Sequence, residues 1–221
     1  RKRSFCSGVP TASIAAAGVT ITVYDVGQGD ATLIRSSSGA TMLFDGGPNG
    51  DGSGTILPHL ASQGITSLDY IVASHYHADH IGGLDEVYSH TGATGGVWDR
   101  GWDYTTLTYS SYANAVAGNR FTLADGQVFD LGDGVTVTCL AVNGNGEIAQ
   151  PHDENSLENE YCVALLVQCG DFDYFQAGDL IGTDASGQDV LSQLIHASRL
   201  AISIGFVSTG IAVLIGVTLG A

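Results

Sequence analysis

The stretch His75-Tyr76-His77-Ala78-Asp79-His80 carries three imidazoles and one carboxylate within six residues. It follows an apolar run at 68–73, which predicts a buried strand, and it precedes Ile81-Gly82-Gly83. A strand that ends in this way places all four side chains at one edge of a sheet. Imidazole nitrogen and carboxylate oxygen are ligands that zinc prefers. The stretch therefore predicts a metal site, and the simpler alternative is a solvated histidine-rich turn.

The composition indicates one globular domain with an acidic surface. A chain of 221 residues with 44% hydrophobic content is long enough to bury a core. The net charge is −16, because seven basic residues face 23 acidic ones. Such a surface repels polyanions, so we expect no tight binding of nucleic acid by a basic groove. The 31 glycines and the scarcity of basic residues are typical of exported proteins and favour a secreted or periplasmic location.

The four cysteines, Cys6, Cys139, Cys162 and Cys169, show no Cys-x-x-Cys spacing. This argues against a zinc site built from cysteines. A disulfide between Cys139 and Cys162 is one interpretation for an exported protein. The other is that these residues are buried thiols.

Periodicity and turn signals predict a mixed chain of strands and helices. Residues 1–18 are predicted to be an irregular lead. Strands are expected at 19–24, 31–35, 41–45, 68–73, 120–123, 127–129, 135–142, 161–168 and 172–176. Helices are expected at 55–63, 84–90 and 104–117.

The metal motif and four further segments together resemble the metallo-β-lactamase superfamily. These segments are Asp25-Val26-Gly27-Gln28-Gly29-Asp30, Leu43-Phe44-Asp45-Gly46-Gly47, Asn155-Ser156-Leu157 and Phe175-Gln176-Ala177-Gly178-Asp179. The first segment resembles the corresponding motif in one branch of this superfamily, which includes the C-terminal hydrolase domain of bacterial competence DNA-uptake proteins and its secreted relatives. The resemblance covers about residues 19–190. It implies an α+β fold, a four-layer αββα sandwich over residues 19–197 that is incomplete at its C-terminal end.

The resemblance also implies a set of metal ligands. His75 and His77 would hold one ion, Asp79 and His80 a second, and Asp179 would bridge the two. His152 is the candidate for a third imidazole on the first ion, or else a surface histidine. Asn155 and Ser156 would line the site without binding metal.

Two further aspartates lie near the motif in this mapping. Asp45 would orient an imidazole through its N–H, unless it only caps a turn, and Asp30 has the same two interpretations.

The implied function is metal-dependent hydrolysis. One or two zinc ions, or other divalent ions, would generate a hydroxide from water, and Asp79 would orient that hydroxide as the catalytic carboxylate. The branch suggests a phosphodiester or nucleotide substrate, whereas the acidic surface leaves small esters, lactones or β-lactams open. A non-catalytic metal-binding module is the rival interpretation.

The end of the chain departs from the family pattern. A His-His-Gly-Ser segment usually supplies the last ligand, but here only the single His196 follows Asp179. Residues 198–221 are instead an apolar tail, uncharged from residue 200 onward. Three interpretations compete for it: a membrane-spanning anchor, a buried strand and turn, or a stretch beyond a shifted reading frame near residue 191. In each case we expect weaker binding of the second ion.

Overall fold

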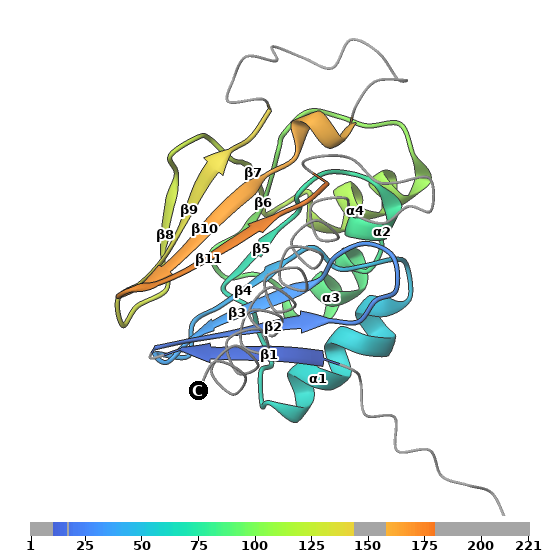
Figure 1. The fold of residues 1–221 in the computed structure, drawn as a ribbon. Coiled ribbons are helices and arrows are strands. Elements are labelled where there is room, and N and C mark those ends of the chain that lie inside the picture. Colours follow the sequence, from blue (N-terminus) through green and yellow to red (C-terminus); the bar gives the residue numbers. More distant parts are fainter. Residues whose placement is uncertain (1–10, 17, 144–157, 180–221) are drawn as a thin grey trace, which may run out of the picture. The chain divides into compact units, whose positions relative to one another are not determined.

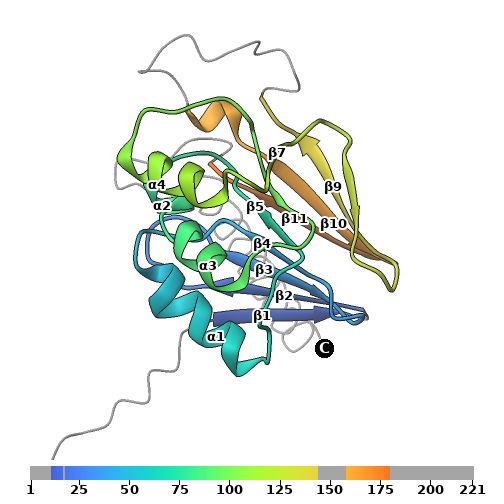
Figure 2. The same ribbon diagram turned by 180° about the vertical axis from the view of Figure 1, so that it is seen from behind.

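The computed structural model describes residues 11–16, 18–143 and 158–179. The described chain contains two β-sheets that pack face to face, with helices on the outer face of the larger one (Figures 1 and 2). Predictions that concern His152, Asn155, Ser156, His196, the tail 198–221 and the domain limit at 197 lie outside these residues.

The larger sheet has seven strands, and their order in space is their order in the sequence. They are β1 (Thr11–Ala16), β2 (Val19–Tyr24), β3 (Thr32–Ser36), β4 (Thr41–Phe44), β5 (Tyr70–Val72), β6 (Val97–Asp99) and β7 (Arg120–Thr122). Strands β1 to β4 pair antiparallel, while β4 to β7 pair parallel. The carboxyl ends of β4, β5 and β6 therefore lie at one edge, where open α/β sheets commonly place their ligand sites.

The smaller sheet is antiparallel, with strand order β11-β10-β9-β8. Its strands are β8 (Val128–Asp130), β9 (Val135–Ala141), β10 (Ala164–Cys169) and β11 (Phe172–Ala177). The helical segments are the π-helical turn η1 (Gly52–Ile56), α1 (Leu57–Ser62), α2 (Ala78–Ile81), α3 (Leu84–Thr91), α4 (Leu107–Val116) and the 3₁₀ turn η2 (Glu158–Tyr161). None of the described helices is both long and apolar enough to cross a bilayer.

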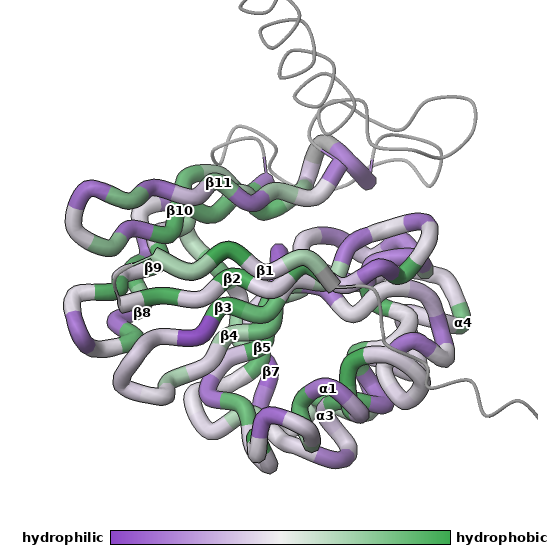
Figure 3. The backbone as a smooth tube through the Cα atoms, turned by 60° about the horizontal axis from the view of Figure 1, so that its bottom comes forward, coloured by the Kyte–Doolittle hydropathy of each residue, from purple (hydrophilic) through white to green (hydrophobic). Residues whose placement is uncertain are grey.

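Two hydrophobic cores separate the layers, and β4 shows how the sequence produces both. Leu43 belongs to the core between the larger sheet and the helices, whereas Met42 and Phe44 belong to the core between the two sheets. Successive strand residues point to opposite faces, so a fully apolar strand serves both cores. Hydrophobic stretches, drawn in green, lie along the strands of both sheets (Figure 3). The described residues therefore form one helical layer and both sheets of the predicted sandwich.

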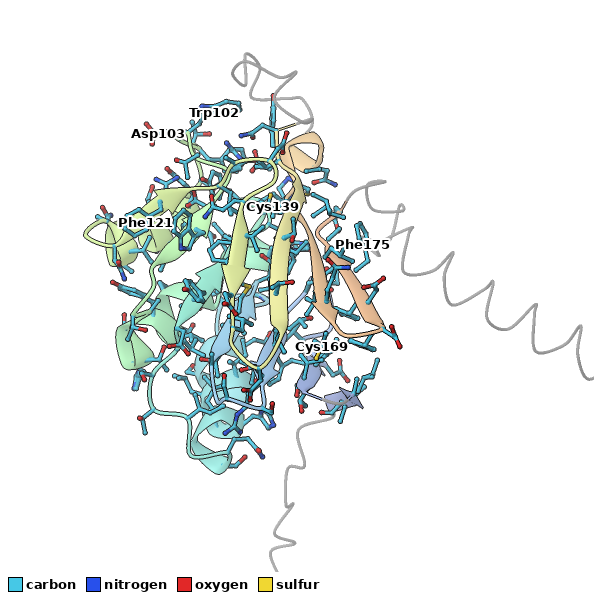
Figure 4. All side chains as sticks on the ribbon, turned by 90° about the vertical axis from the view of Figure 1, so that its left-hand side faces the viewer. Trp102, Asp103, Phe121, Cys139, Cys169 and Phe175 are labelled. Atoms are coloured by element: carbon cyan, nitrogen blue, oxygen red, sulfur yellow. The ribbon has the colours of Figure 1, made fainter. Side chains whose placement is uncertain are left out.

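Two expectations need correction. The lead at 1–18 is not irregular throughout, because Thr11–Ala16 pairs with β2 as an antiparallel edge strand. Strand β6 was not predicted, since its short sequence Val97-Trp98-Asp99 lies between glycine-rich segments that suggest a loop. Of the two interpretations for the cysteines, that of buried thiols is confirmed, because Cys139, on β9 (Figure 4), and Cys162 are buried and free.

Candidate metal centre

The metal motif lies at the carboxyl edge of the larger sheet. Strand β5 ends at Val72, and residues 73–77 lead without a regular element into the short helix α2, which contains Asp79 and His80. The neighbouring parallel strand β4 ends beside it and is followed at once by Asp45. Because β4 and β5 are both buried in the sheet, their ends bring these polar residues into the interior. Asp45, His75 and His80 are each fully buried.

A chain of hydrogen bonds runs from His80 to His75 through Asp45 and Ser74. Asp45 Oδ2 lies 2.9 Å from His80 Nδ1 and 2.6 Å from Ser74 Oγ. Asp45 Oδ1 accepts the backbone N–H of Ser74 at 2.7 Å. Ser74 Oγ in turn lies 2.9 Å from His75 Nδ1. Asp45 therefore orients His80, which is one of the two roles predicted for it. Through Ser74 it also fixes the backbone at the start of the motif.

These hydrogen bonds fix which ring nitrogen of each imidazole is free to bind a metal ion. The Ser74 hydroxyl donates to the Asp45 carboxylate, so its oxygen is left to accept the N–H of His75 Nδ1. His80 likewise donates from Nδ1 to Asp45. In both rings the Nε2 atom is then the one that faces the centre, and an outer partner that holds Nδ1 in this way is the usual arrangement around metal-binding histidines.

Asp179 enters the centre from the smaller sheet. It follows Gly178 directly after β11 and is almost fully buried, with 3% of its surface exposed. Its Oδ1 lies 3.6 Å from His80 Nε2, and Asn159 Nδ2 donates to its Oδ2 at 3.3 Å. A Cβ atom on Gly178 would lie 2.6 Å from Ser74 Oγ, so only glycine allows this close approach. Ligand atoms of His75, His80 and Asp179 lie within 4.8 Å of one another.

The remaining predicted residues lie around this trio. His77 is half-buried, and its Nδ1 lies 3.0 Å from His75 Nε2, so it adjoins the trio without belonging to either group of candidate ligands in the described chain. Asp79 is half-buried in the first turn of α2 and belongs to neither group of described residues that could hold an ion. The division of ligands between two ions stays a prediction, as does the role of His152.

Asp30 and two other residues complete the surroundings. Asp30, Asp45 and His80 form a second group whose ligand atoms also lie within 4.8 Å. Ser74 and Asn159 were not predicted to take part. The sequence offered only one signal for Ser74, its place between the buried strand and the first histidine, and none for Asn159.

Burial and charge set the two histidines apart. Burial, with the nearby charges of His80, His77 and Arg100, holds the pKa of His75 well below its ordinary value. Burial also lowers the pKa of His80, but the hydrogen bond and charge of Asp45, with Asp30 and Asp179, outweigh it and raise this pKa to about 9. His75 is therefore neutral near pH 7, the form that binds metal. The carboxylates around His80, in contrast, favour a positive charge at its ring.

The donor set fits a divalent metal ion. His80 Nε2 and Asn159 Oδ1 are buried and have no hydrogen-bond partner among the described residues. Buried polar atoms are rarely left without a partner, because their desolvation costs about 1–3 kcal/mol each. An ion held by His75, His80 and Asp179 would satisfy Nε2, and the imidazole and carboxylate donors suit zinc.

Comparison with known proteins places the motif in a family. The model of the metallo-beta-lactamase superfamily matches residues 24–148. A segment of 67 residues, 30% of this chain, is 39% identical to competence protein ComA of Neisseria gonorrhoeae and spans 10% of that protein. Among solved structures, a metallo-beta-lactamase variant from Cronobacter sakazakii aligns with a TM-score of 0.49 and 19% identity, over 75% of this chain and 63% of that one. The subclass B3 metallo-beta-lactamase MEM-A1 from a soil metagenome aligns with a TM-score of 0.49 and 20% identity, over 76% and 62%.

Proposed function

The chain belongs to the metallo-beta-lactamase superfamily, and from this premise we propose that it is a zinc-dependent hydrolase. The observation that carries the proposal is the convergence of His75, His80 and Asp179 around Nε2 of His80, an atom that has no hydrogen-bond partner within the described part of the chain. A divalent ion bound there supplies Lewis acidity and lowers the pKa of water toward neutrality. The proposal includes a second ion, with His77 and Asp79 among the ligands.

The residues of the chain have separate tasks in this proposal. Asp45 and Ser74 keep the Nδ1 protons of both histidines in place and so direct both Nε2 atoms inward. Asn159 fixes the carboxylate of Asp179 through its amide N–H. Asp79 would accept a hydrogen bond from the attacking water and orient it toward the substrate.

For the substrate we propose a phosphodiester or nucleotide of small size. The local similarity to a competence protein supports the branch to which the motifs point. The net charge of −16 disfavours long polyanions, because the acidic surface would repel them away from the metal. Bound cations would reverse the sign of the potential locally and could still attract a single phosphate ester. The same charge makes uncharged esters and lactones the second candidate class, and the composition supports action outside the cytoplasm.

The test combines metal analysis with a substrate panel. The purified chain should contain at least one zinc ion per molecule by elemental analysis. It should hydrolyse one class among chromogenic phosphodiesters, lactones and nitrocefin, and His80→Ala should lose both zinc and activity. Bound zinc without turnover of any substrate would favour the binding-module alternative, and absence of zinc binding would refute the proposal.

A further inference from the structure

A buried carboxylate next to the centre accepts hydrogen bonds from two different parts of the chain. Glu158 begins η2 and is only 5% exposed. Its Oε1 accepts the backbone N–H of Tyr76 at 2.8 Å and the Nε–H of Arg100 at 2.7 Å. Its Oε2 accepts the Nη2–H of Arg100 at 2.8 Å. The ion pair is therefore bidentate, which is the strong geometry for arginine and carboxylate.

Arg100 is itself held on every side. It is fully buried, and its guanidinium lies 4.0 Å from the ring centroid of Tyr76 and 5.2 Å from that of Tyr161. Its Nη1–H donates to Gly101 O at 3.1 Å, and its own carbonyl accepts Asn143 Nδ2 at 2.9 Å. The loop after β6 that follows Arg100, with Trp102 at its tip, lies at the same end of the molecule as η2 (Figure 4).

We propose that the Arg100–Glu158 pair is a positioning clamp for the metal centre. Tyr76 stands between the first two histidines of the motif, so the bond from Glu158 to its N–H fixes the backbone from which both imidazoles project. The next residue after Glu158 is Asn159, which donates to Asp179. One carboxylate thus ties the motif of the larger sheet to the turn that orients the ligand from the smaller sheet.

The pair is poorly explained as a device for stability alone. Two buried charges lose much of their mutual attraction to desolvation, and a hydrophobic replacement of a buried ion pair is often neutral or stabilising. The Arg100 guanidinium also covers the ring of Tyr76, whose hydroxyl donates to Gly101 O at 2.7 Å and accepts from Arg120 Nη2 at 2.6 Å. Both ends of Tyr76 are thereby fixed, its main chain by Glu158 and its side chain by the loop after β6.

The experiment measures zinc affinity rather than catalysis, and it rests on the metal-binding part of the proposed function. Zinc dissociation constants are measured by chelator competition at 15 °C for the intact chain and for Glu158→Gln, Glu158→Ala and Arg100→Lys. The Gln side chain keeps the volume and an acceptor for Tyr76 N–H but removes the charge that holds Arg100. Absorption spectra with Co²⁺ in place of zinc report the ligand geometry. Val137→Ala, a truncation in the core between the sheets, is the control for loss of stability alone.

We expect folded Glu158→Gln to bind zinc about 3-fold more weakly and Glu158→Ala about 10-fold, the lower end of the range seen when a direct hydrogen-bond partner of a metal ligand is removed, because Glu158 acts through the backbone of Tyr76. The Co²⁺ spectrum should change in both, while Val137→Ala should lower the melting temperature and leave the dissociation constant and spectrum unchanged. Unaltered zinc affinity in the Glu158 variants, or equal weakening in Val137→Ala, would overturn the clamp. Failure of Glu158→Gln to fold even with excess zinc would also overturn it, because the pair would then be needed for the fold and not for the site. If the unaltered chain bound no zinc, the proposed function itself would fail.

Discussion

Replacing Asp45 by Asn tests the chain of hydrogen bonds that directs the histidines. Asp45 has a φ of 58°, in the left-handed region, and Asn is among the few residues that accept this conformation readily. The backbone should therefore stay in place. In the variant, the amide oxygen can still accept the N–H of Ser74. The amide NH₂ group then takes the place of Oδ2, the oxygen that faces His80 in the unaltered protein. That group cannot accept from Nδ1, so the neutral ring is driven to carry its proton on Nε2, the atom that must bind metal.

The magnitude follows from the bond that is lost. The bond between His80 Nδ1 and Asp45 Oδ2 measures 2.9 Å and is fully buried. A hydrogen bond to a charged group contributes about 1.5–3 kcal/mol, and about 1.4 kcal/mol corresponds to a factor of ten in a binding constant. Asp45→Asn should therefore weaken zinc binding about 10- to 100-fold at neutral pH.

The assay is chelator competition for zinc at pH 7.5, with Asp69→Asn as the matched control. Asp69 also accepts a backbone N–H and a hydroxyl, both from Thr41, at 2.8 and 3.1 Å, but it contacts no histidine. It lies just before β5, at the amino end of the strand whose carboxyl end leads to the motif. The control should bind zinc like the unaltered chain. Zinc affinity of Asp45→Asn within threefold of the unaltered value would refute the proposed orientation of His80.

Three more predictions concern Gly29, the thiols and the effect of metal on stability. Gly29→Ala should destabilise the fold in urea titration at least about twice as much as Gly27→Ala; both have positive φ, which costs about 1–2 kcal/mol for alanine, but only at Gly29 would a Cβ collide with the carbonyl of Asp79. Burial and the charge of Asp125 raise the pKa of Cys139 to about 11. At pH 8, no more than one of the four thiols should therefore react rapidly with a disulfide reagent in the native protein, whereas all four should react after unfolding. If only two thiols reacted in the unfolded protein, a disulfide would be present after all. Zinc at 100 times its dissociation constant should stabilise the fold by about 2.7 kcal/mol and raise the melting temperature by about 5–10 °C, and a chelator should reverse the shift; equal melting curves with and without zinc would contradict the fit of the site.

The sequence predicted most of the elements because their signals are local. Alternation and apolar runs located β2 to β5 and β7 to β11, and the turn residues around them gave the boundaries to within a few residues. The helix expected at 104–117 is α4, with Thr106 as its N-cap, whose side chain accepts the N–H of Tyr109. The two strands that were missed, β1 and β6, are short or rich in alanine. Their pairing with β2 and β5 defines them more than their own sequences do.

Only the metal-site residues that lie together in one sequence motif could be predicted from the sequence alone. His75, His77 and His80 lie within six residues, so their convergence follows from one turn of chain. Asp179 required the resemblance to a family, because nothing in the local sequence shows which distant strand end lies opposite. Contacts such as Tyr76 with Glu158, 82 positions apart, depend on how the two sheets pack, and no local pattern encodes that.

Backbone hydrogen bonds between neighbouring loops hold the metal motif in place. Gly46 N–H donates to the carbonyl of His80 at 2.7 Å, Gly47 N–H to that of Asp30 at 2.9 Å, and Gly83 N–H to that of Gly47 at 3.0 Å. Cβ atoms at Gly46, Gly47 and Gly83 would meet other atoms at less than 3.0 Å, so these bonds require glycine. Since three loops are locked together by their backbones, binding a metal need not order them, and a preorganised site binds more tightly than a flexible one with the same ligands. A first ion should therefore bind tightly at this centre.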